Sequence, residues 1–275
     1  MEHYICNMTL SKKIYLIPVL IFVFVSCTSN EKKVTHFGDP NSIQAIKNTI
    51  KEYPDSVILK ENLIEAYRNE GYYDSAIAIA DQELAKDKGS AYLWNIKATL
   101  YFENNDTLKA INSLEHAIDI YPLPEYLVAL GTVYAEIKNK NALLIADQLL
   151  ANNKVKSGKD AYFIKGLYYN YTNDPQKAIV NLDSCLRLDF TYMYAYREKA
   201  IAFYDQANYQ EALKVLKRAV TIQNNFDEGY YWMGKCYEKL NQKQDAIQSY
   251  QNALLYDKNY TEARSALEKL TESSN

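Results

Sequence analysis

A 34-residue spacing of aromatic and small residues constrains the fold of this chain more than any other feature of its sequence. The clearest copy of the pattern, at residues 230–259, consists of Tyr230, Met233, Gly234, Tyr237, Ala246, Tyr250 and Ala253. Copies that begin at 57, 91, 159, 193 and 227 are separated by multiples of 34 residues, and a shifted sixth copy occupies residues 124–158. Six copies predict a stack of similar units, because a unit of this size buries its apolar face only against its neighbours.

Each copy contains two segments with the period of a helix. Apolar residues recur at i, i+3, i+4 and i+7, which places them on one helical face. A small residue at the eighth position of several copies is expected to let two helices approach closely: Gly131, Gly166, Ala200 and Gly234. Prolines fall between the segments, with Pro122 and Pro124 at one junction and Pro175 in the first turn of a later helix. The pattern therefore predicts helix pairs joined by short turns.

This pattern resembles the tetratricopeptide repeat (TPR). The resemblance implies an all-α fold, a right-handed superhelical solenoid of antiparallel helix pairs, with six repeats over residues 57–260. The copy at 124–158 departs from the pattern, because Gly131 comes one residue early and Ala142 two residues early. A lengthened loop is expected after it, at residues 152–160 (NNKVKSGKD).

The segments beside the array are expected to be helical as well. Residues 42–56 are predicted to form an N-terminal half-repeat helix, which ends before Pro54. Residues 261–275 are predicted to be a C-terminal capping helix and tail. Arg264 and Glu268 stand there at the packing positions, and a polar outer face suits a terminal unit.

Residues 1–26 have the composition of a signal peptide. Lys12 and Lys13 precede an apolar run at residues 14–25, which is too short for a membrane-spanning helix. The signal begins at Met1 or, in a more conventional form, at Met8.

The pair Ser26-Cys27 after this run resembles a bacterial lipobox, with Phe24 where leucine is usual. The resemblance is to TPR-containing bacterial lipoproteins of the Bacteroidetes type. It implies lipidation at Cys27, a flexible tether over residues 27–41 and a membrane-tethered place in the bacterial cell envelope, facing the periplasm rather than the surface. An uncleaved anchor and an ordinary secretory signal remain alternatives.

Charge and cysteine content narrow the function classes. The formal net charge is −3 and the charges of both signs are scattered, so binding of nucleic acid has no electrostatic support. This balance argues against the similarly long pentatricopeptide repeats, which read RNA. Cys185 and Cys236 lie three helix-to-helix steps apart in the repeat register, beyond the reach of a disulfide. We expect them to be buried free thiols.

No catalytic constellation is present in the sequence. The 3 histidines are scattered, and there is no metal-ligand spacing, phosphate loop or nucleophile motif. The chain is therefore predicted not to be an enzyme and to need no cofactor or metal. Three triplets that begin at Asp55, Asp74 and Asp106 resemble O-glycosylation acceptors of Bacteroidetes envelope proteins. Helix capping is the favoured interpretation, because all three stand where a helix is expected to begin.

The TPR resemblance also implies a binding groove, lined by the first helices of successive pairs on the concave side of the solenoid. The residues expected to line it are mostly aromatic or basic: Tyr92, Asn95, Phe102, Phe163, Tyr171, Tyr194, Arg197, Tyr204, Tyr231 and Lys235. Tyrosine and arginine are enriched at interaction hot spots. The alternative is that some of these side chains pack against neighbouring helices and widen the core.

The predicted function is a non-catalytic protein–protein interaction scaffold that binds a peptide or protein partner and reaches the membrane through its lipid. Alternatives are a self-assembling structural lipoprotein, hence a homo-oligomer, or an adaptor for envelope assembly, secretion or cell-wall enzymes. TPR families that hold the acidic C-termini of heat-shock chaperones use lysine and asparagine where this chain has Glu61 and Glu65. That acidic class of ligand is therefore not expected.

Overall fold

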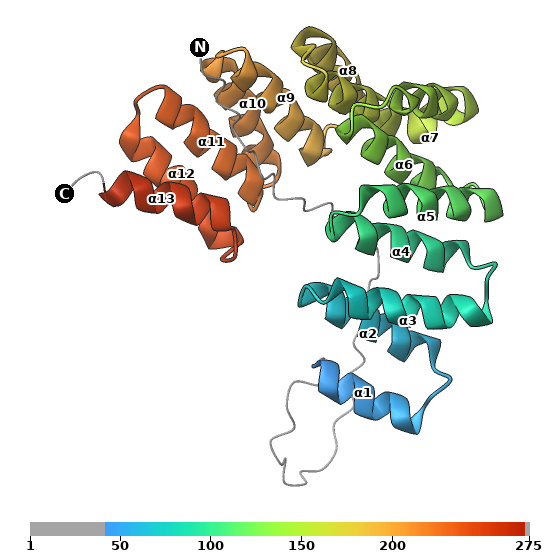
Figure 1. The fold of residues 1–275 in the computed structure, drawn as a ribbon. Helices are drawn as coiled ribbons and strands as arrows, with labels where there is room; N and C mark the ends of the chain where they lie inside the picture. Colours follow the sequence, from blue (N-terminus) through green and yellow to red (C-terminus); the bar gives the residue numbers. More distant parts are fainter. Residues whose placement is uncertain (1–41, 273–275) are drawn as a thin grey trace, which may run out of the picture. The chain divides into compact units, whose positions relative to one another are not determined.

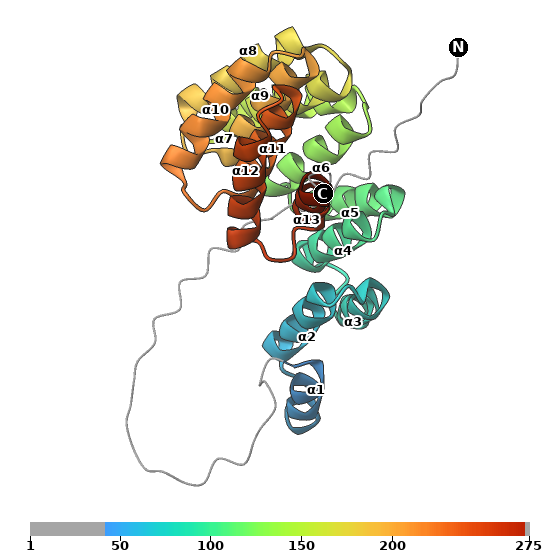
Figure 2. The ribbon, with the colours of Figure 1, turned by 90° about the vertical axis from the view of Figure 1, so that its left-hand side faces the viewer.

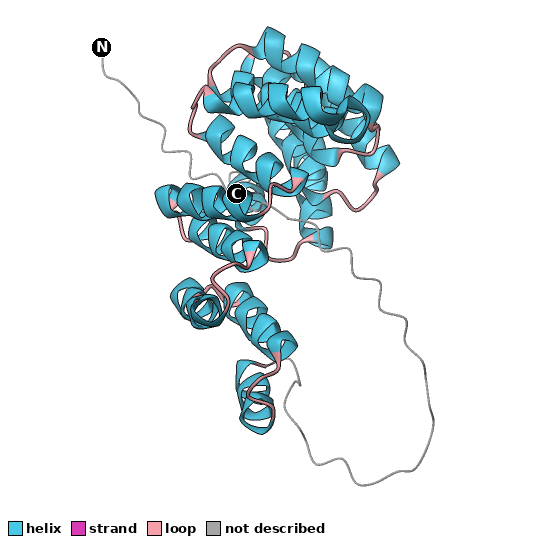
Figure 3. Cartoon of the chain, turned by 90° about the vertical axis from the view of Figure 1, so that its right-hand side faces the viewer, coloured by secondary structure: helices cyan, strands magenta, loops and turns pink. Residues whose placement is uncertain are grey.

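The computed structural model describes residues 42–272, except for the side chains of residues 153–155. All regular structure in this part of the chain is helical (Figure 3). The helices are α1 Ile43–Glu52, α2 Val57–Asn69, α3 Tyr73–Lys86, α4 Ala91–Glu103, α5 Thr107–Ile120, α6 Pro124–Glu136, α7 Asn141–Tyr171, α8 Pro175–Leu188, α9 Met193–Asp205, α10 Tyr209–Ile222, α11 Asp227–Lys239, α12 Lys243–Tyr256 and α13 Thr261–Glu272. The predicted signal peptide, Cys27 and the tether lie outside the described residues.

The chain divides into two compact units between Tyr121 and Pro122. Unit 1 contains α1–α5, which stack in chain order (Figures 1 and 2), and unit 2 contains α6–α13. Within each unit every helix packs against the next one, and in unit 2 α9 also packs against α7 and α11. The prediction of an all-α solenoid built from helix pairs is confirmed.

The 34-residue period reappears in the helix boundaries. The first helices of five pairs or half-pairs start at Val57, Ala91, Met193, Asp227 and Thr261. Two of these N-terminal ends have a local side-chain cap: Ser56 and Ser90 cap α2 and α4, accepting from the amides of Leu59 and Leu93 at 3.4 and 3.3 Å. The sequence period therefore predicts where these helices begin.

A left-handed residue closes the turn inside each pair. The residues with positive φ are Gly71, Asn105, Lys138, Asn173, Ala207 and Asn241. The following amide bonds back to the aromatic residue of the first helix, as in Tyr72 N to Tyr67 O at 2.8 Å. This hydrogen bond is the one that closes a Schellman motif and ends the helix. Glycine and asparagine adopt this conformation readily, whereas an alanine there costs about 1–2 kcal/mol.

Small residues at the eighth position allow the paired helices to touch. A Cβ atom added to Gly166 would lie 2.6 Å from Cγ of Leu182, and one added to Gly234 would lie 2.5 Å from Cε1 of Tyr250. Leu182 and Tyr250 are completely buried, so they have little room to move away. The predicted close approach is confirmed at these two pairs.

Helix α7 corrects the sequence prediction. It runs without interruption for 31 residues, through the segment 152–160 where we expected a loop. The polar composition of that segment suggested a loop, but polarity alone does not end a helix. The segment has no proline and a single glycine, Gly158, while lysine has a high helix propensity. The second helix of the third repeat and the first helix of the fourth are therefore one element.

The three acidic triplets differ in their capping. Ser56 caps α2 as described, and Asp106 caps α5 by accepting from the amide of Lys109 at 3.2 Å. The capping prediction is wrong for the triplet at Asp74, which lies in the first turn of α3 and makes no cap hydrogen bond there. The N-cap residue of α3 is Tyr72.

Helix α13 covers the last pair of unit 2. Its Ala263 is fully buried, and Leu267 and Leu270 pack on the same cluster, which includes Tyr250 and Ala253 of α12. Arg264 is exposed. The polar side of this helix faces solvent and its apolar side replaces the neighbour that a further repeat would provide.

Candidate functional site

The first helices of unit 2 present a surface of half-buried polar and aromatic side chains. Because α9 packs against both α7 and α11, the C-terminal part of α7 and these two helices lie side by side. We call this surface the first-helix surface of unit 2; it consists of Asn170, Tyr171, Tyr194, Arg197, Tyr204, Glu228, Tyr231 and Lys235. Six of the ten residues predicted to line a groove are among them.

An ionic network centred on Arg197 joins the three helices. Its Nη1 donates to Oε1 and Oε2 of Glu228 on α11 at 2.9 and 2.7 Å. Its Nε donates to Oε1 of Glu198 at 3.0 Å. Asn170 on α7 donates through Nδ2 to the backbone oxygen of Glu198 at 2.9 Å. Because α7 and α11 each supply one member and α9 supplies two, the network fixes the spacing of neighbouring repeats.

Burial and charge shape the electrostatics of this surface. Burial alone would lower the pKa of Arg197, but the charges of Glu228 and Glu198 hold that pKa above its ordinary value. Burial, reinforced by the carboxylates of Glu136 and Glu198, raises the pKa of Tyr171. The guanidinium therefore stays charged and the phenol stays protonated as a hydrogen-bond donor.

Aromatic rings form a continuous patch beside the network. The Tyr231 ring lies 4.9 Å from that of Tyr260, and Trp232 lies 5.5 Å from Tyr204. The ammonium group of Lys235 lies 5.8 Å from the Tyr204 ring. These separations are within the range of favourable aromatic and cation–π contacts, so the rings hold one another in place.

Two of the predicted groove residues belong to the core. Phe102 and Phe163 are only 5% and 6% exposed, so their assignment to an open surface is wrong. The Phe163 ring packs against Tyr192, 5.1 Å away, which precedes α9 and covers it. The alternative interpretation, that some of these aromatics widen the core, holds for both.

The remaining two predicted residues lie in unit 1, on α4. Tyr92 is 51% exposed, whereas Asn95 is half-buried and its Oδ1 atom is buried without a hydrogen-bond partner. On the neighbouring first helix, Ile58 is 69% exposed. Unit 1 therefore has a first-helix surface of its own, which consists of Ile58, Glu61, Tyr92 and Asn95.

Sequence reasoning missed several residues of the site in unit 2. Glu228 occupies the same repeat position as Tyr92 and Tyr194, so the rule that found them could have found it. Tyr260 follows Tyr192 by 68 residues, two periods, and each precedes a first helix. Glu198 had no such signal, because a charged residue that is 6% exposed breaks the apolar pattern.

Nothing in residues 42–272 points to metal chemistry or a membrane span. In that range no group of three or more His, Cys, Asp or Glu side chains is arranged to hold a metal ion. No helix of the same range is both long and apolar enough to cross a membrane. Cys185 and Cys236 are free and buried.

The sequence matches repeat families along much of its length. Residues 61–92, 91–122 and 159–192 match family models described as tetratricopeptide repeat. Residues 190–275 match the model described as regulator of microtubule dynamics protein 1-3. The chain is 33% identical over 91 residues to Protein STIP1 homolog of Dictyostelium discoideum, a match that covers 30% of this chain and 16% of that protein. The match thus spans less than a fifth of that relative's length.

Solved structures share the fold at low sequence identity. A tetratricopeptide repeat protein from Parabacteroides merdae superposes with a TM-score of 0.69 at 18% identity, over 83% of this chain and 91% of that one. PilW, a type IV pilus biogenesis factor, has a TM-score of 0.58 at 20% identity, over 78% and 97%. A thermophilic TPR protein from Thermus thermophilus has a TM-score of 0.58 at 15% identity, over 66% and 99%.

The helix pairs, their 34-residue register and the matched repeat families agree with one another. This chain is a member of the tetratricopeptide-repeat family.

Proposed function

We propose that this chain is a non-catalytic interaction scaffold of a bacterial cell envelope, which binds a protein segment on its first-helix surfaces. Its repeats suggest a protein-interaction role in general. The observation that carries the proposal is the first-helix surface of unit 2, where Arg197 holds Glu228 at 2.7 Å and rings pack on one another. Side chains that are already fixed lose little entropy when a partner binds, so such a surface favours binding.

The envelope location rests on the N-terminal sequence. The apolar run and the Ser26-Cys27 pair support a lipoprotein signal, and a lipid at Cys27 would tether the repeats to a membrane. One acyl chain gives only marginal membrane binding, so stable tethering needs more than one. Metabolic labelling with a palmitate analogue should mark the protein and fail with Cys27→Ser. Equal labelling of both would refute lipidation at Cys27.

The binding role is tested by crosslinking in cells, followed by purification of the tagged full chain and mass spectrometry. The test variant carries Tyr194→Ala and Lys235→Ala, which remove a ring stacked 5.2 Å from the Arg197 guanidinium carbon and a cation beside Tyr204. The matched control carries Tyr256→Ala and Lys243→Ala, the same residue types on α12.

We expect one or more proteins to be captured by the wild-type chain and the control but lost from the test variant. If the test variant still captures the same proteins, they bind at a surface other than the first-helix surface of unit 2. Capture of this chain alone would instead support the self-assembling alternative, and light scattering of the purified protein would then give a mass above that of one chain.

A further inference from the structure

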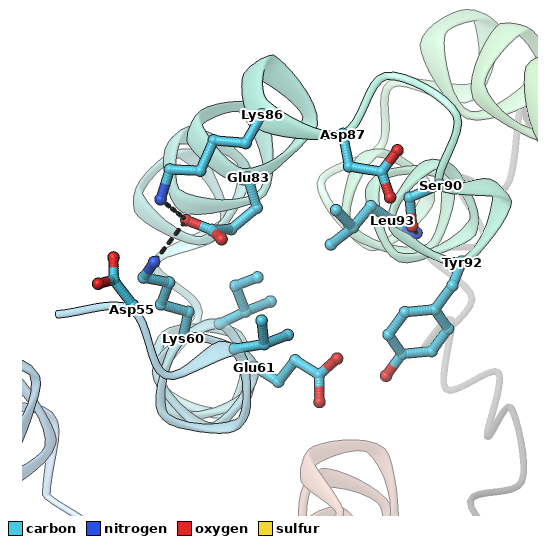
Figure 4. A pocket seen from close by; sticks show the side chains of 11 residues that line it. Asp55, Lys60, Glu61, Glu83, Lys86, Asp87, Ser90, Tyr92 and Leu93 are labelled. Atoms are coloured by element: carbon cyan, nitrogen blue, oxygen red, sulfur yellow. Dashed lines mark hydrogen bonds and ion pairs between the residues drawn. The ribbon is translucent and has the colours of Figure 1, made fainter. Parts of the chain in front are cut away.

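A pocket opens between the first two repeats of unit 1 (Figure 4). It has a volume of about 290 Å³ and is formed by α2, the end of α3, the following turn and the start of α4. Ile64 and Leu93 are buried apolar side chains that line it. Glu61 and Tyr92 extend from α2 and α4 toward each other at its opening (Figure 4). Both residues belong to the first-helix surface of unit 1.

The two lysines of this pocket already share one carboxylate partner. Lys60 and Lys86 both approach Oε1 of Glu83, at 3.0 and 2.9 Å, on the side away from Glu61 (Figure 4). Burial would raise the pKa of Glu83, but the hydrogen bonds from Lys86 and Lys60 lower it. Glu83 therefore remains ionised and keeps both lysines.

The negative charge of Glu61 has no such counterpart. Among the described residues, no hydrogen bond or ion pair to its carboxylate exists, and burial raises its pKa. The other lining carboxylates, Asp55 and Asp87, add to the negative potential; the Asp87 carboxylate accepts the amide of Gly89, at 3.1 Å. A partly desolvated carboxylate with no cation gains when a cation arrives.

The exposed ring of Tyr92 complements this charge. Elsewhere in unit 1 an ammonium group already lies over a tyrosine ring, as Lys47 does over Tyr67 at 5.1 Å. A cation beside Glu61 would approach the Tyr92 ring in the same manner, since the two side chains extend toward each other at the opening (Figure 4). The aliphatic stem of a lysine or arginine would lie against Ile64 and Leu93.

We propose that this pocket binds a lysine or arginine side chain of a protein segment, with the cation between the Glu61 carboxylate and the Tyr92 ring. The proposal rests on the scaffold function above and adds the chemistry of the partner, a basic segment. Charge complementarity selects that occupant. A basic segment has the opposite charge to an acidic ligand, which the lining carboxylates would repel.

The test is methyl NMR of the full chain titrated with the capped tripeptides Gly-Lys-Gly and Gly-Arg-Gly. Gly-norleucine-Gly, which has the stem without the charge, and Gly-Glu-Gly are the control ligands. We expect the basic tripeptides to shift the methyl signals of Ile64 and Leu93 with millimolar affinity, and to leave those of Ile145 and Ile164 in unit 2 unchanged. Glu61→Gln should weaken this binding by about tenfold and Tyr92→Leu by about threefold.

Glu65→Gln is the matched control, because Glu65 is exposed one turn further along α2 and does not line the pocket. Equal shifts with the norleucine tripeptide, equal losses in Glu61→Gln and Glu65→Gln, or no shift at all would overturn the proposal. The two proposals fail separately. A partner captured in cells that binds Glu61→Gln unchanged would leave the scaffold standing without this pocket, whereas tripeptide binding without any captured partner would leave the pocket without the scaffold.

Discussion

Gly234 shows how a single residue sets the distance between two helices. A methyl group there would overlap the Tyr250 ring, which is fully buried and hydrogen-bonded to Glu238. Gly234→Ala should therefore lower the free energy of unfolding by about 1–2 kcal/mol, since the overlap outweighs the gain in helix propensity of about 1 kcal/mol. Chemical denaturation measures the change. Gly89→Ala is the control, because a Cβ there would meet only Asp87 Oδ1, at an ordinary contact distance of 3.5 Å. An unchanged free energy of unfolding in Gly234→Ala would contradict the packing argument.

The two buried thiols should be inert in the folded protein. Burial raises the pKa of Cys236 to about 12, and burial together with the charges of Asp160 and Asp189 raises the pKa of Cys185 well above its usual range. Because the thiolate is the reactive form, iodoacetamide at neutral pH should leave both residues unmodified until denaturant is added. Peptide-level mass spectrometry distinguishes each cysteine. Rapid alkylation of either one without denaturant would show that the thiol is accessible.

The site illustrates what a repeat pattern predicts about single residues. The pattern assigned Tyr194 and Arg197 to one side of the first helices, because position in the repeat fixes the direction of a side chain, and both are half-buried there. It was wrong for Phe163, because direction does not reveal that Tyr192 lies over that ring. Covering residues come from the next turn of the chain, and a helical period carries no information about them.

Element boundaries were predictable where a turn has its own chemistry. Gly71 and Asn105 adopt the left-handed conformation that ends a first helix, and both residue types favour it. The segment 152–160 contains residues of these types, Asn152, Asn153 and Gly158, yet α7 continues through it, so its polar composition misled the prediction. A helix is ended by backbone requirements, which composition does not report.

The continuity of α7 can be tested with proline. Asn152→Pro would remove an interior amide hydrogen bond and crowd the preceding turn, so it should reduce the free energy of unfolding by about 3 kcal/mol. Circular dichroism during urea unfolding gives the value. Lys243→Pro is the control, because Lys243 is the first residue of α12, the position that Pro175 already occupies in α8. Equal tolerance of both substitutions would mean that residues 152–160 form a loop.

At the scale of the whole molecule, the sequence predicted one array and the structure has two units. The repeat register resumes at residue 159 after the shifted copy at 124–158, so periodicity predicted one array across the boundary between Tyr121 and Pro122. Prolines at 122 and 124 lack the amide that would continue a helix there. Each unit has a core of its own, with Leu100 buried in unit 1 and Leu182 buried in unit 2.

Separate cores predict separate unfolding, and the 2 tryptophans of the chain report on it. Trp94 lies in unit 1 beside His116, with ring centres 4.5 Å apart, and Trp232 lies in unit 2 beside Tyr204. Leu100→Ala should destabilise unit 1 by about 2–5 kcal/mol, because it leaves a cavity in a close-packed core. In a Trp232→Phe background the fluorescence midpoint in urea should fall.

In a Trp94→Phe background the same Leu100→Ala substitution should leave the midpoint reported by Trp232 in place, and Leu182→Ala should give the reverse pair of results. Repeat arrays unfold according to the strength of the coupling between neighbouring repeats, so independent midpoints would mean that the two units unfold separately. If Leu100→Ala instead lowers the urea midpoints reported by Trp94 and by Trp232 together, the helices of both units unfold as one cooperative array. The boundary between the two units would then carry no thermodynamic meaning.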